Sequence, residues 1–303
     1  MSDGAGKVAF ITGGASGLGF GMAQAFCSAG MKVVIADIRQ DHLDQSIEHF
    51  ARRGERQSVH PIRVDVTDRK AMAAAADETE RVFGKVHVVC NNAGINLFND
   101  IAAATWDDWD WVLGVNLGGV VNGVHTFLPR IRKHGEGGHI VNTASMAAFI
   151  AGPSAGIYTC AKFAVRGLSE ALRFSAAPLG IRVSVVCPGL IDSAIYESDR
   201  IRPTHLASTS GPLDPGFVSR LADLHHRAGM APLEAGERVL RGMRRGDFYI
   251  FTHPEFKDEL REIFDEALAA LPDEQPPAER LAFEDRRRAL KAQARASWKG
   301  LQP

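Results

Sequence analysis

Three side chains near the middle of the chain are of types that together could move a proton. Tyr158 and Lys162 stand four residues apart at the start of a helical pattern, so they share one helix face. A free phenol, with a pKa near ~10, is a poor acid or base at neutral pH. A cation about 4 Å away contributes about 4 kcal/mol at an effective dielectric constant near 20, or roughly three pKa units. We predict that Lys162 lowers the pKa of Tyr158 into the range useful for general acid/base catalysis, while Ser145 holds a substrate oxygen beside it.

A Tyr-x-x-x-Lys pair also arises by chance, so the surrounding sequence must show whether this pair is catalytic. Residues 7–12 form a short apolar run typical of a buried strand, and residues 20–29 form a helical pattern. Between them lies the glycine-rich segment Gly13-Gly14-Ala15-Ser16-Gly17-Leu18-Gly19. Such a turn lets the backbone approach a pyrophosphate, and the helix start offers free N–H groups. A purely structural turn is the alternative.

The end of the second apolar run carries a residue that bears on cofactor choice. Asp37 follows the glycines by roughly the ~20 residues at which an acidic side chain meets a ribose 2′-hydroxyl. A carboxylate there would repel a 2′-phosphate, and no Lys or Arg stands inside the glycine turn. We therefore predict NAD in preference to NADP, a preference that Arg39 could soften.

Apolar runs and helical patterns alternate along most of the chain. Further strands are expected at residues 32–36, 58–64, 86–90, 139–143, 182–187 and 247–251, and helices at 41–52, 69–83, 106–133, 156–177 and 232–245. This alternation predicts an α/β fold with a doubly wound parallel sheet, whose ligands bind at the carboxyl ends of the strands. Asp65, Asn92 and Ser145 follow three of these strands, so all three belong to the expected binding edge; Asp65 could instead only cap the next helix.

Composition and charge favour an ordinary soluble protein. The 303 residues are 45% hydrophobic and 23% charged, with a formal net charge of -1, so nothing indicates nucleic acid or an anionic membrane. The four cysteines form no CxxC motif and are expected to be reduced thiols. His205, His225 and His226 lack metal-ligand spacing, so no metal is expected. We expect a cytoplasmic protein without a membrane segment.

These motifs closely resemble the classical short-chain dehydrogenase/reductase family. The resemblance covers roughly residues 5–250 and rests on Thr12-Gly13-x-x-x-Gly17-x-Gly19, Asn91-Asn92-Ala93-Gly94, Asn116, Ser145, Tyr158-x-x-x-Lys162 and Pro188-Gly189. It implies one Rossmann-type domain with about seven strands, in three α/β/α layers. It also implies a catalytic tetrad of Asn116, Ser145, Tyr158 and Lys162, in which Lys162 also binds the nicotinamide ribose and Asn116 supports a proton-relay water.

The resemblance implies specific cofactor contacts as well. Main-chain groups of Gly13, Ser16, Leu18 and Gly19 would surround the pyrophosphate, next to Gly17. Asp37 corresponds to the NAD-selecting acid. The remaining cofactor positions would be Asp65 and Val66 at the adenine, Asn92, Ala93 and Gly94 along the adenosine wall, and Pro188, Gly189, Ile191 and Ser193 at the nicotinamide. Ser193 replaces the threonine common in the family, so its hydroxyl is retained.

The segment over residues 190–231 is rich in Ser, Thr, Pro, Gly and His and is expected to be a long loop. A loop of this length is either a substrate lid or a surface segment without a selective role, and the two interpretations are equally open. As a lid it would form substrate walls, for which the residues expected are Asn96, Met146, Phe149, Leu190, Ile195 and Tyr196. Its partly apolar character suggests a bulky or aromatic substrate.

The last part of the chain exceeds a minimal family member. Residues 1–251 are expected to form the Rossmann domain, and residues 252–303 a helical extension with a helix to about residue 271 and a charged one over 278–298. Leu290, Ala294 and Trp298 share one face of the second helix, which would pack on a neighbouring subunit or extend as a solvated arm. The family favours a homodimer or homotetramer built on the helices at 106–133 and 156–177.

We therefore expect an NAD-dependent alcohol dehydrogenase or ketone reductase acting on a secondary alcohol. The tail and lid resemble a bacterial subgroup that includes Cα-dehydrogenases of lignin β-aryl ethers, which implies oxidation of a benzylic alcohol. Steroid or sugar alcohols are the competing substrates. Three competing functions are an epimerase or dehydratase of the extended branch, a metal-dependent dehydrogenase, and a regulatory protein that binds NAD(H) without turnover.

Overall fold

The computed structural model describes residues 4–98, 100–207 and 214–299, and its core is one parallel sheet. The strands are β1 (Val8–Thr12), β2 (Lys32–Asp37), β3 (Val59–Arg63), β4 (Val88–Asn91), β5 (Gly138–Thr143), β6 (Ile181–Cys187) and β7 (Tyr249–Phe251). Their order is β3-β2-β1-β4-β5-β6-β7, and every described pair is parallel. The chain thus winds outward from β1 in both directions, and the predicted doubly wound α/β fold with seven strands is confirmed.

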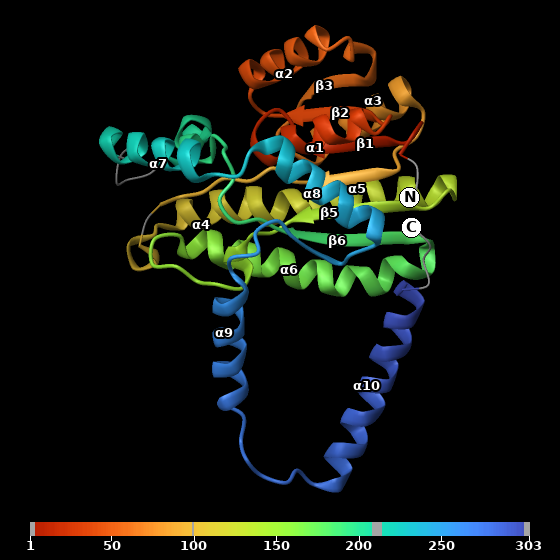
Figure 1. The fold of residues 1–303 in the computed structure, drawn as a ribbon, viewed down its shortest axis with the longest axis vertical. Helices are drawn as coiled ribbons and strands as arrows, with labels where there is room; N and C mark the ends of the chain where they lie inside the picture. Colours follow the sequence, from red (N-terminus) through yellow and green to blue (C-terminus); the bar gives the residue numbers. More distant parts are fainter. Residues whose placement is uncertain (1–3, 99, 208–213, 300–303) are drawn as a thin grey trace.

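Helices cover both faces of the sheet (Figure 1). One face carries α1 (Gly17–Ser28), α2 (Gln40–Arg52) and α8 (Pro232–Arg245), and the other carries α3 (Arg69–Phe83), α5 (Gly119–His134) and α6 (Gly156–Ala176). Side chains alternate between the two faces: Phe10 of β1 belongs to one buried cluster and Ile11 to the other. This alternation within fully buried strands holds the three layers together.

Helices α1 and α8 pack very closely because glycines face each other across their contact. A Cβ atom on Gly21 would lie 1.7 Å from the Pro232 carbonyl oxygen, and one on Gly236 would lie 2.1 Å from the Gly21 oxygen. Only glycine allows this approach. This close contact holds α8 against α1, the helix that follows the glycine-rich turn.

The long helix predicted over residues 106–133 has an internal irregularity. It comprises α4 (Trp106–Leu113), a π-helical turn η3 (Gly114–Gly118) and α5. By length and composition Trp106–His134 is apolar enough to cross a membrane, which was not expected from the sequence. Trp111 and Phe127 within it are buried against the body of the protein, whereas Trp106 at its start is 85% exposed.

The segment predicted as a long loop contains helices. These are η6 (Ile195–Ile201), η7 (Thr204–Leu206) and α7 (Pro215–Ala228), while residues 208–213 lie outside the described part of the chain. Asp214 caps α7 by accepting from the Phe217 N–H at 2.7 Å, and Pro215 occupies the first turn. The Asp-Pro dipeptide was the sequence signal for the start of this helix. The Ser- and Thr-rich residues before it nevertheless led to the prediction of a loop.

Two helices follow β7. Helix α9 (Lys257–Ala269) ends two residues before the expected end at about residue 271, and α10 (Ala278–Lys299) completes the chain's described part. Figure 1 shows both projecting from the body beneath α6, joined at their far ends by a loop. The Trp298 side chain, expected on one face of α10, lies outside the described part of the structure. The remaining short helices are η1 (Arg56–Ser58), η2 (Ile101–Ala103), η4 (Met146–Ala148) and η5 (Ala177–Leu179).

One buried histidine on β5 makes stability depend on pH. His139 is 1% exposed, its Nε2 atom is 2.8 Å from the Ser184 hydroxyl, and burial lowers its pKa to about 3. The unfolded chain, with a histidine pKa near ~6.5, therefore takes up a proton first as the pH falls. We expect stability to be lost between about pH 6.5 and 3, at up to about 1.4 kcal/mol per pH unit from this residue alone.

Replacement of His139 by Gln should reduce that acid slope. Urea unfolding between pH 7 and 4 measures it, and His125→Gln at an exposed position is the matched control. An unchanged slope in His139→Gln would show that this buried imidazole does not control acid stability.

Candidate active site

Ser145, Tyr158 and Lys162 come together at the carboxyl ends of the strands. Ser145 follows β5 and accepts a hydrogen bond from the Ala147 N–H at 3.1 Å, which starts the short helix η4. Tyr158 and Lys162 lie in the first turns of α6. The Ser145 hydroxyl is hydrogen-bonded to the Tyr158 side chain, and all three residues line one cavity of about 790 Å³.

Lys162 is buried, and a hydrogen bond to the end of strand β5 holds its ammonium group. Its Nζ atom donates to the Thr143 carbonyl oxygen at 2.9 Å and lies 5.3 Å from the centre of the Tyr158 ring. Burial lowers the pKa of this ammonium group to about 8. The lysine is therefore positioned by the strand end rather than by the phenol.

The pKa of Tyr158 departs from the sequence prediction. Burial raises this pKa above its usual value, and the hydrogen bond from Ser145 acts in the opposite direction without cancelling the effect. The expected lowering by Lys162 is thus absent here, because desolvation of the phenolate is the largest effect and Lys162 is not among the groups that shift this pKa. In this state the phenol is neutral at pH 7 and can donate a proton.

Asn116 lies behind the cavity wall and is not among the residues that line the cavity. It is fully buried in the π-helical turn, where its Oδ1 atom accepts from the Ile95 N–H at 2.8 Å and its Nδ2 atom donates to the Ile95 oxygen at 2.9 Å. A Cβ on Gly94 would lie 3.2 Å from that Oδ1 atom and 3.4 Å from Lys162 Nζ. Asn116 thus fixes the segment after β4 directly against Lys162.

The glycine-rich turn forms the other half of the cavity. The predicted cofactor residues that line it are Gly13, Ser16, Gly17, Leu18, Asp37, Asp65, Val66, Asn92, Ala93, Gly94, Pro188, Gly189, Ile191 and Ser193. Gly19 lies beneath the turn, where a Cβ would be 2.0 Å from the Gly13 oxygen. Ser16, the residue before α1, makes no side-chain capping bond, which leaves the N–H groups of the first turn available for an anion.

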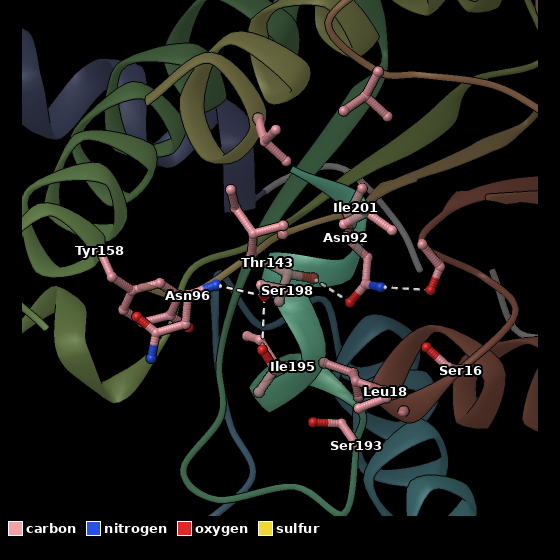
Figure 2. Close-up of a pocket in the computed structure, with 18 of the residues that line it drawn as sticks. Ser16, Leu18, Asn92, Asn96, Thr143, Tyr158, Ser193, Ile195, Ser198 and Ile201 are labelled. Atoms are coloured by element: carbon pink, nitrogen blue, oxygen red, sulfur yellow. Dashed lines mark hydrogen bonds between the residues drawn. The ribbon is translucent and has the colours of Figure 1, made fainter. Parts of the chain in front are cut away.

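Thr12 and Asn92 join the glycine turn to the end of β4. The Thr12 hydroxyl accepts from the N–H groups of Asn92 and Ala93 at 2.9 and 3.1 Å, and Asn92 Nδ2 donates to the Thr12 and Gly13 oxygens. The side chain of Asn92 also accepts from the Thr143 hydroxyl at 3.2 Å (Figure 2). Its amide therefore ties the glycine turn to the ends of β4 and β5, at the place where the sequence predicted a cofactor wall.

Asp37 lies at the far end of this half. Its carboxylate accepts from the N–H groups of Ala15 at 3.2 Å and Arg39 at 3.1 Å. The Arg39 guanidinium, which could have softened a preference for NAD, is already paired with Asp41 and with Glu197 of η6, the latter at 2.9 Å. Glu197 was not predicted, because only the fold brings residues 39 and 197 together.

Of the six residues predicted as substrate walls, four line the cavity and two do not; the half that they line is called the substrate half below. Asn96, Met146, Leu190 and Ile195 line it. Phe149 does not, because its ring is buried against Tyr249, Phe251 and Phe264 and beneath the Arg166 guanidinium. Tyr196 also points elsewhere and packs on His225 and His226.

Several residues that were not predicted from the sequence line this half of the cavity instead. The lining residues that sequence reasoning missed are Phe98, Trp111, Ser198, Ile201, Leu206 and Phe256. They come from four separate segments, so no local pattern marks them. Three are aromatic, so this half offers apolar ring surfaces next to polar residues such as Asn96 and Ser198.

One polar atom in the substrate half has no partner among the described residues. The Asn96 Oδ1 atom is buried without a hydrogen bond, whereas the Asn96 N–H donates to the Ser198 hydroxyl at 3.0 Å. Asn96 lines the cavity, although this oxygen atom is itself shielded from the open space.

A buried ion pair holds the segment after η6 against α4. Arg202 and Asp108 are 2.6 Å apart, with side chains 7% and 3% exposed, and the guanidinium lies over the Trp111 ring. Asp108 also accepts from the Thr105 N–H at 2.9 Å. The pair therefore fixes Ile201 and Leu206 as cavity walls.

Residues 7–203 match the family model described as short chain dehydrogenase. The chain belongs to that family. It is 40% identical over 270 residues to the C alpha-dehydrogenase of Sphingobium sp. (strain NBRC 103272 / SYK-6), with 87% of this chain and 86% of the relative covered. This comparison agrees with the family resemblance found from the motifs.

Two further proteins are similar. A 3beta-hydroxysteroid dehydrogenase 2 from Eggerthella lenta is 37% identical over 187 residues, covering 61% of this chain and 71% of the relative. A crystal structure of a short chain dehydrogenase/reductase from Burkholderia phymatum in complex with NAD is 32% identical, with a TM-score of 0.83, and covers 92% of this chain and 100% of that one. The short-chain dehydrogenase is thus an oxidoreductase of a family that uses nicotinamide cofactors.

The described residues contain no group of three or more His, Cys, Asp or Glu side chains arranged to hold a metal ion. Among the histidines of residues 190–231, His226 lies 2.8 Å from an Asp192 oxygen. The Nδ1 atom of His225 lies 2.9 Å from the Ile191 carbonyl oxygen. Both contacts tie α7 to the segment after β6 that carries Ile191.

Proposed function

We propose that this enzyme oxidises a bulky secondary alcohol, preferably a benzylic one, to a ketone with NAD. The observation that carries the proposal is the position of the hydrogen-bonded Ser145 and Tyr158 side chains where two halves of one cavity meet. One half has the glycine turn and Asp37, and the other has Phe98, Trp111 and Phe256. A cytoplasmic setting agrees with the free cysteines of the described chain.

The residues of the first half fit a dinucleotide. The uncapped start of α1 suits a pyrophosphate, Asp37 suits a ribose diol, and Lys162 suits the second ribose. When bound, the nicotinamide would accept or donate the hydride at C4. The chain of the Burkholderia phymatum relative, seen in complex with NAD, supports the same choice.

The protein's own side chains would handle the proton and the orientation of the substrate. Ser145 holds the substrate oxygen by a hydrogen bond, and Tyr158 exchanges the hydroxyl proton with it. Lys162 stabilises the phenolate that forms when Tyr158 acts as the base, because the cation is buried with it and weakly screened. Asn116 is a positioning residue that keeps the segment before Asn96 in place.

The apolar walls and the unpartnered Asn96 oxygen favour an aryl substrate with a second hydroxyl group. The aromatic side chains would contact the ring, and the Asn96 amide oxygen, turned toward the cavity, would accept from the additional hydroxyl. The similarity to a C alpha-dehydrogenase agrees with such a substrate. A steroid alcohol is the second candidate, because a cavity of about 790 Å³ is large and a hydroxysteroid dehydrogenase is among the relatives.

NADH formation from a panel of secondary alcohols tests the proposal. The panel contains benzylic alcohols with and without a second hydroxyl, steroid, sugar and short aliphatic alcohols, each with NAD and with NADP. We expect the benzylic diols to give the highest kcat/KM with NAD. Binding of NADH without turnover of any alcohol would favour a regulatory protein instead, and full activity in excess chelator would exclude a metal-dependent reaction.

Cofactor choice should depend on Asp37 together with Glu197. In the double variant Asp37→Ser/Glu197→Gln the carboxylate facing the 2′ position is lost and Arg39 loses one of its two acidic partners. We expect the ratio of kcat/KM for NADP over NAD to rise about tenfold or more, a change of about 1.4 kcal/mol. Glu48→Gln on the exposed surface of α2 is the control, and an unchanged ratio in the double variant would refute this basis for NAD selection.

A further inference from the structure

The loop after β6, from Pro188 to Ser193, joins the two places that the proposed reaction must connect. At one end the Pro188 carbonyl oxygen accepts from the Met146 N–H at 2.9 Å, directly after Ser145. At the other end a Cβ atom on Gly17 would lie 2.7 Å from the Ser193 Cβ atom. A dinucleotide that reaches from the glycine turn to the Ser145 hydroxyl therefore lies along this loop, with its nicotinamide beside the first loop residues.

His253 stands next to these first residues because the pairing of β6 with β7 brings the two chain segments together. Cys187 pairs with Phe251, so two residues further along each strand His253 comes beside Gly189. The Gly189 N–H donates to His253 Nδ1 at 3.0 Å, and His253 Nε2 lies 3.0 Å from the Leu190 carbonyl oxygen. The imidazole thus supplies the hydrogen bonds at the point where main-chain pairing of the two strands ends.

The contacts of His253 fix its tautomer. Its Nδ1 atom faces two donors, the Gly189 N–H and the Thr252 hydroxyl at 2.7 Å, so this atom carries the lone pair. The proton is then on Nε2, which donates to the Leu190 oxygen. One neutral imidazole therefore satisfies a donor and an acceptor on consecutive loop residues and holds both in one orientation.

The ring also packs on the loop, and its own segment is well supported. A Cβ atom on Gly189 would lie 2.8 Å from His253 Cγ and 2.7 Å from Phe256 Cε2, so two rings cover this glycine. Arg238 of α8 donates to the Thr252 carbonyl oxygen, and α8 packs closely on α1. The support of the loop thus extends back to the helix that follows the glycine turn.

We propose that His253 is a positioning residue for the nicotinamide and acts through Gly189 and Leu190. Both loop residues line the cavity, whereas His253 does not. Because the imidazole already orders the loop, cofactor binding does not have to meet that entropic cost, and the loop presents one fixed surface to the nicotinamide. The inference rests on the proposed use of a nicotinamide cofactor and assigns a role to a residue outside the sequence motifs described above.

Binding of NADH and of ADP-ribose, measured by calorimetry, tests this role. ADP-ribose reports on the glycine turn and Asp37, and NADH adds the nicotinamide. The variant His253→Phe keeps a ring over Gly189 but makes neither hydrogen bond to the loop. We expect it to weaken NADH binding about tenfold, or about 1.4 kcal/mol, and to leave ADP-ribose binding within about twofold of the wild type.

Two conservative variants separate the two hydrogen bonds. In His253→Asn the amide oxygen can replace Nδ1 and accept from the Gly189 N–H, and in His253→Gln the amide nitrogen can replace Nε2 and donate to the Leu190 oxygen. Each should lose less NADH affinity than His253→Phe, and both allow the same comparison if the Phe variant does not fold. Thr252→Val, which removes a hydroxyl but neither bond to the loop, is the matched control and should bind both ligands like the wild type.

Several results would overturn the inference. An equal loss of affinity for both ligands would show that His253 only supports the fold, and an unchanged NADH affinity would show that the loop does not depend on it. Equal binding of NADH and ADP-ribose by the wild type would show that the nicotinamide is not held at all. The comparison needs no turnover, so it is decided separately from the alcohol panel; a wild type that binds neither ligand would overturn the proposed function as well.

Discussion

Replacement of Tyr158 by Phe should lower kcat for alcohol oxidation by about 10²- to 10⁴-fold while leaving NADH binding intact. The change removes the phenolic oxygen that exchanges the substrate proton and keeps the ring that packs in the first turns of α6. Steady-state kinetics with the best alcohol of the panel measures kcat, and NADH fluorescence titration measures cofactor affinity. Activity within about tenfold of the wild type would remove Tyr158 from the acid/base role.

The pH profile gives a second test of the same residue. Oxidation needs the phenolate, and burial raises the pKa of Tyr158 above its usual value. The rate of oxidation by the wild type should therefore rise toward alkaline pH, while reduction of the ketone, which needs the neutral phenol, should not. The residual activity of Tyr158→Phe should lack this rise. Ser145→Ala serves as a comparison, because it removes the hydrogen bond that opposes the pKa increase.

Loss of Arg202 should have the largest effect on the substrate half of the cavity. The variant Arg202→Met keeps much of the side chain's volume but leaves the Asp108 carboxylate, 2% exposed, without its cation. Removal of one partner of a buried ion pair costs about 3 to 5 kcal/mol. We expect a marked loss of stability in urea and a raised KM for the alcohol, since Ile201 and Leu206 would no longer be held in the wall.

The double variant Arg202→Met/Asp108→Asn separates the ion pair from general damage. With both charges removed, no uncompensated carboxylate remains, so its loss of stability should be smaller than the sum of the two single losses. Arg200→Met nearby, whose side chain is 67% exposed, is the matched control and should be close to wild type. Strict additivity in the double variant would show that the two side chains act independently.

The order of strands and helices followed from the sequence because it depends on local patterns. Fully apolar runs such as the one containing Phe10, each followed by a helical pattern, permit few arrangements besides a parallel sheet covered on both faces. The same regularity places Gly13, Asp37 and Ser145 at strand ends, which share one edge in any parallel sheet. For this reason almost all the residues predicted to contact the cofactor line one cavity.

The substrate walls depended on contacts between distant segments. Phe149 and Tyr196 have suitable side chains at suitable positions, yet the first is enclosed by β7 and α9 and the second by α7. Phe256 and Trp111 line the cavity although they are far from the motifs in the chain. Rotations of a few residues around a short helix such as η6 decide these directions, and no periodic pattern records them.

The sequence by itself determined the doubly wound sheet, the glycine turn and the set Ser145, Tyr158 and Lys162, because each depends on residue type and spacing along the chain. Only the tertiary structure decided the pKa of Tyr158, which burial raises above its usual value. It also decided that Arg39 is engaged by Glu197. Burial, ion pairs across the fold and the spacing of helices are properties of packing, so they exist only once distant parts of the chain have met.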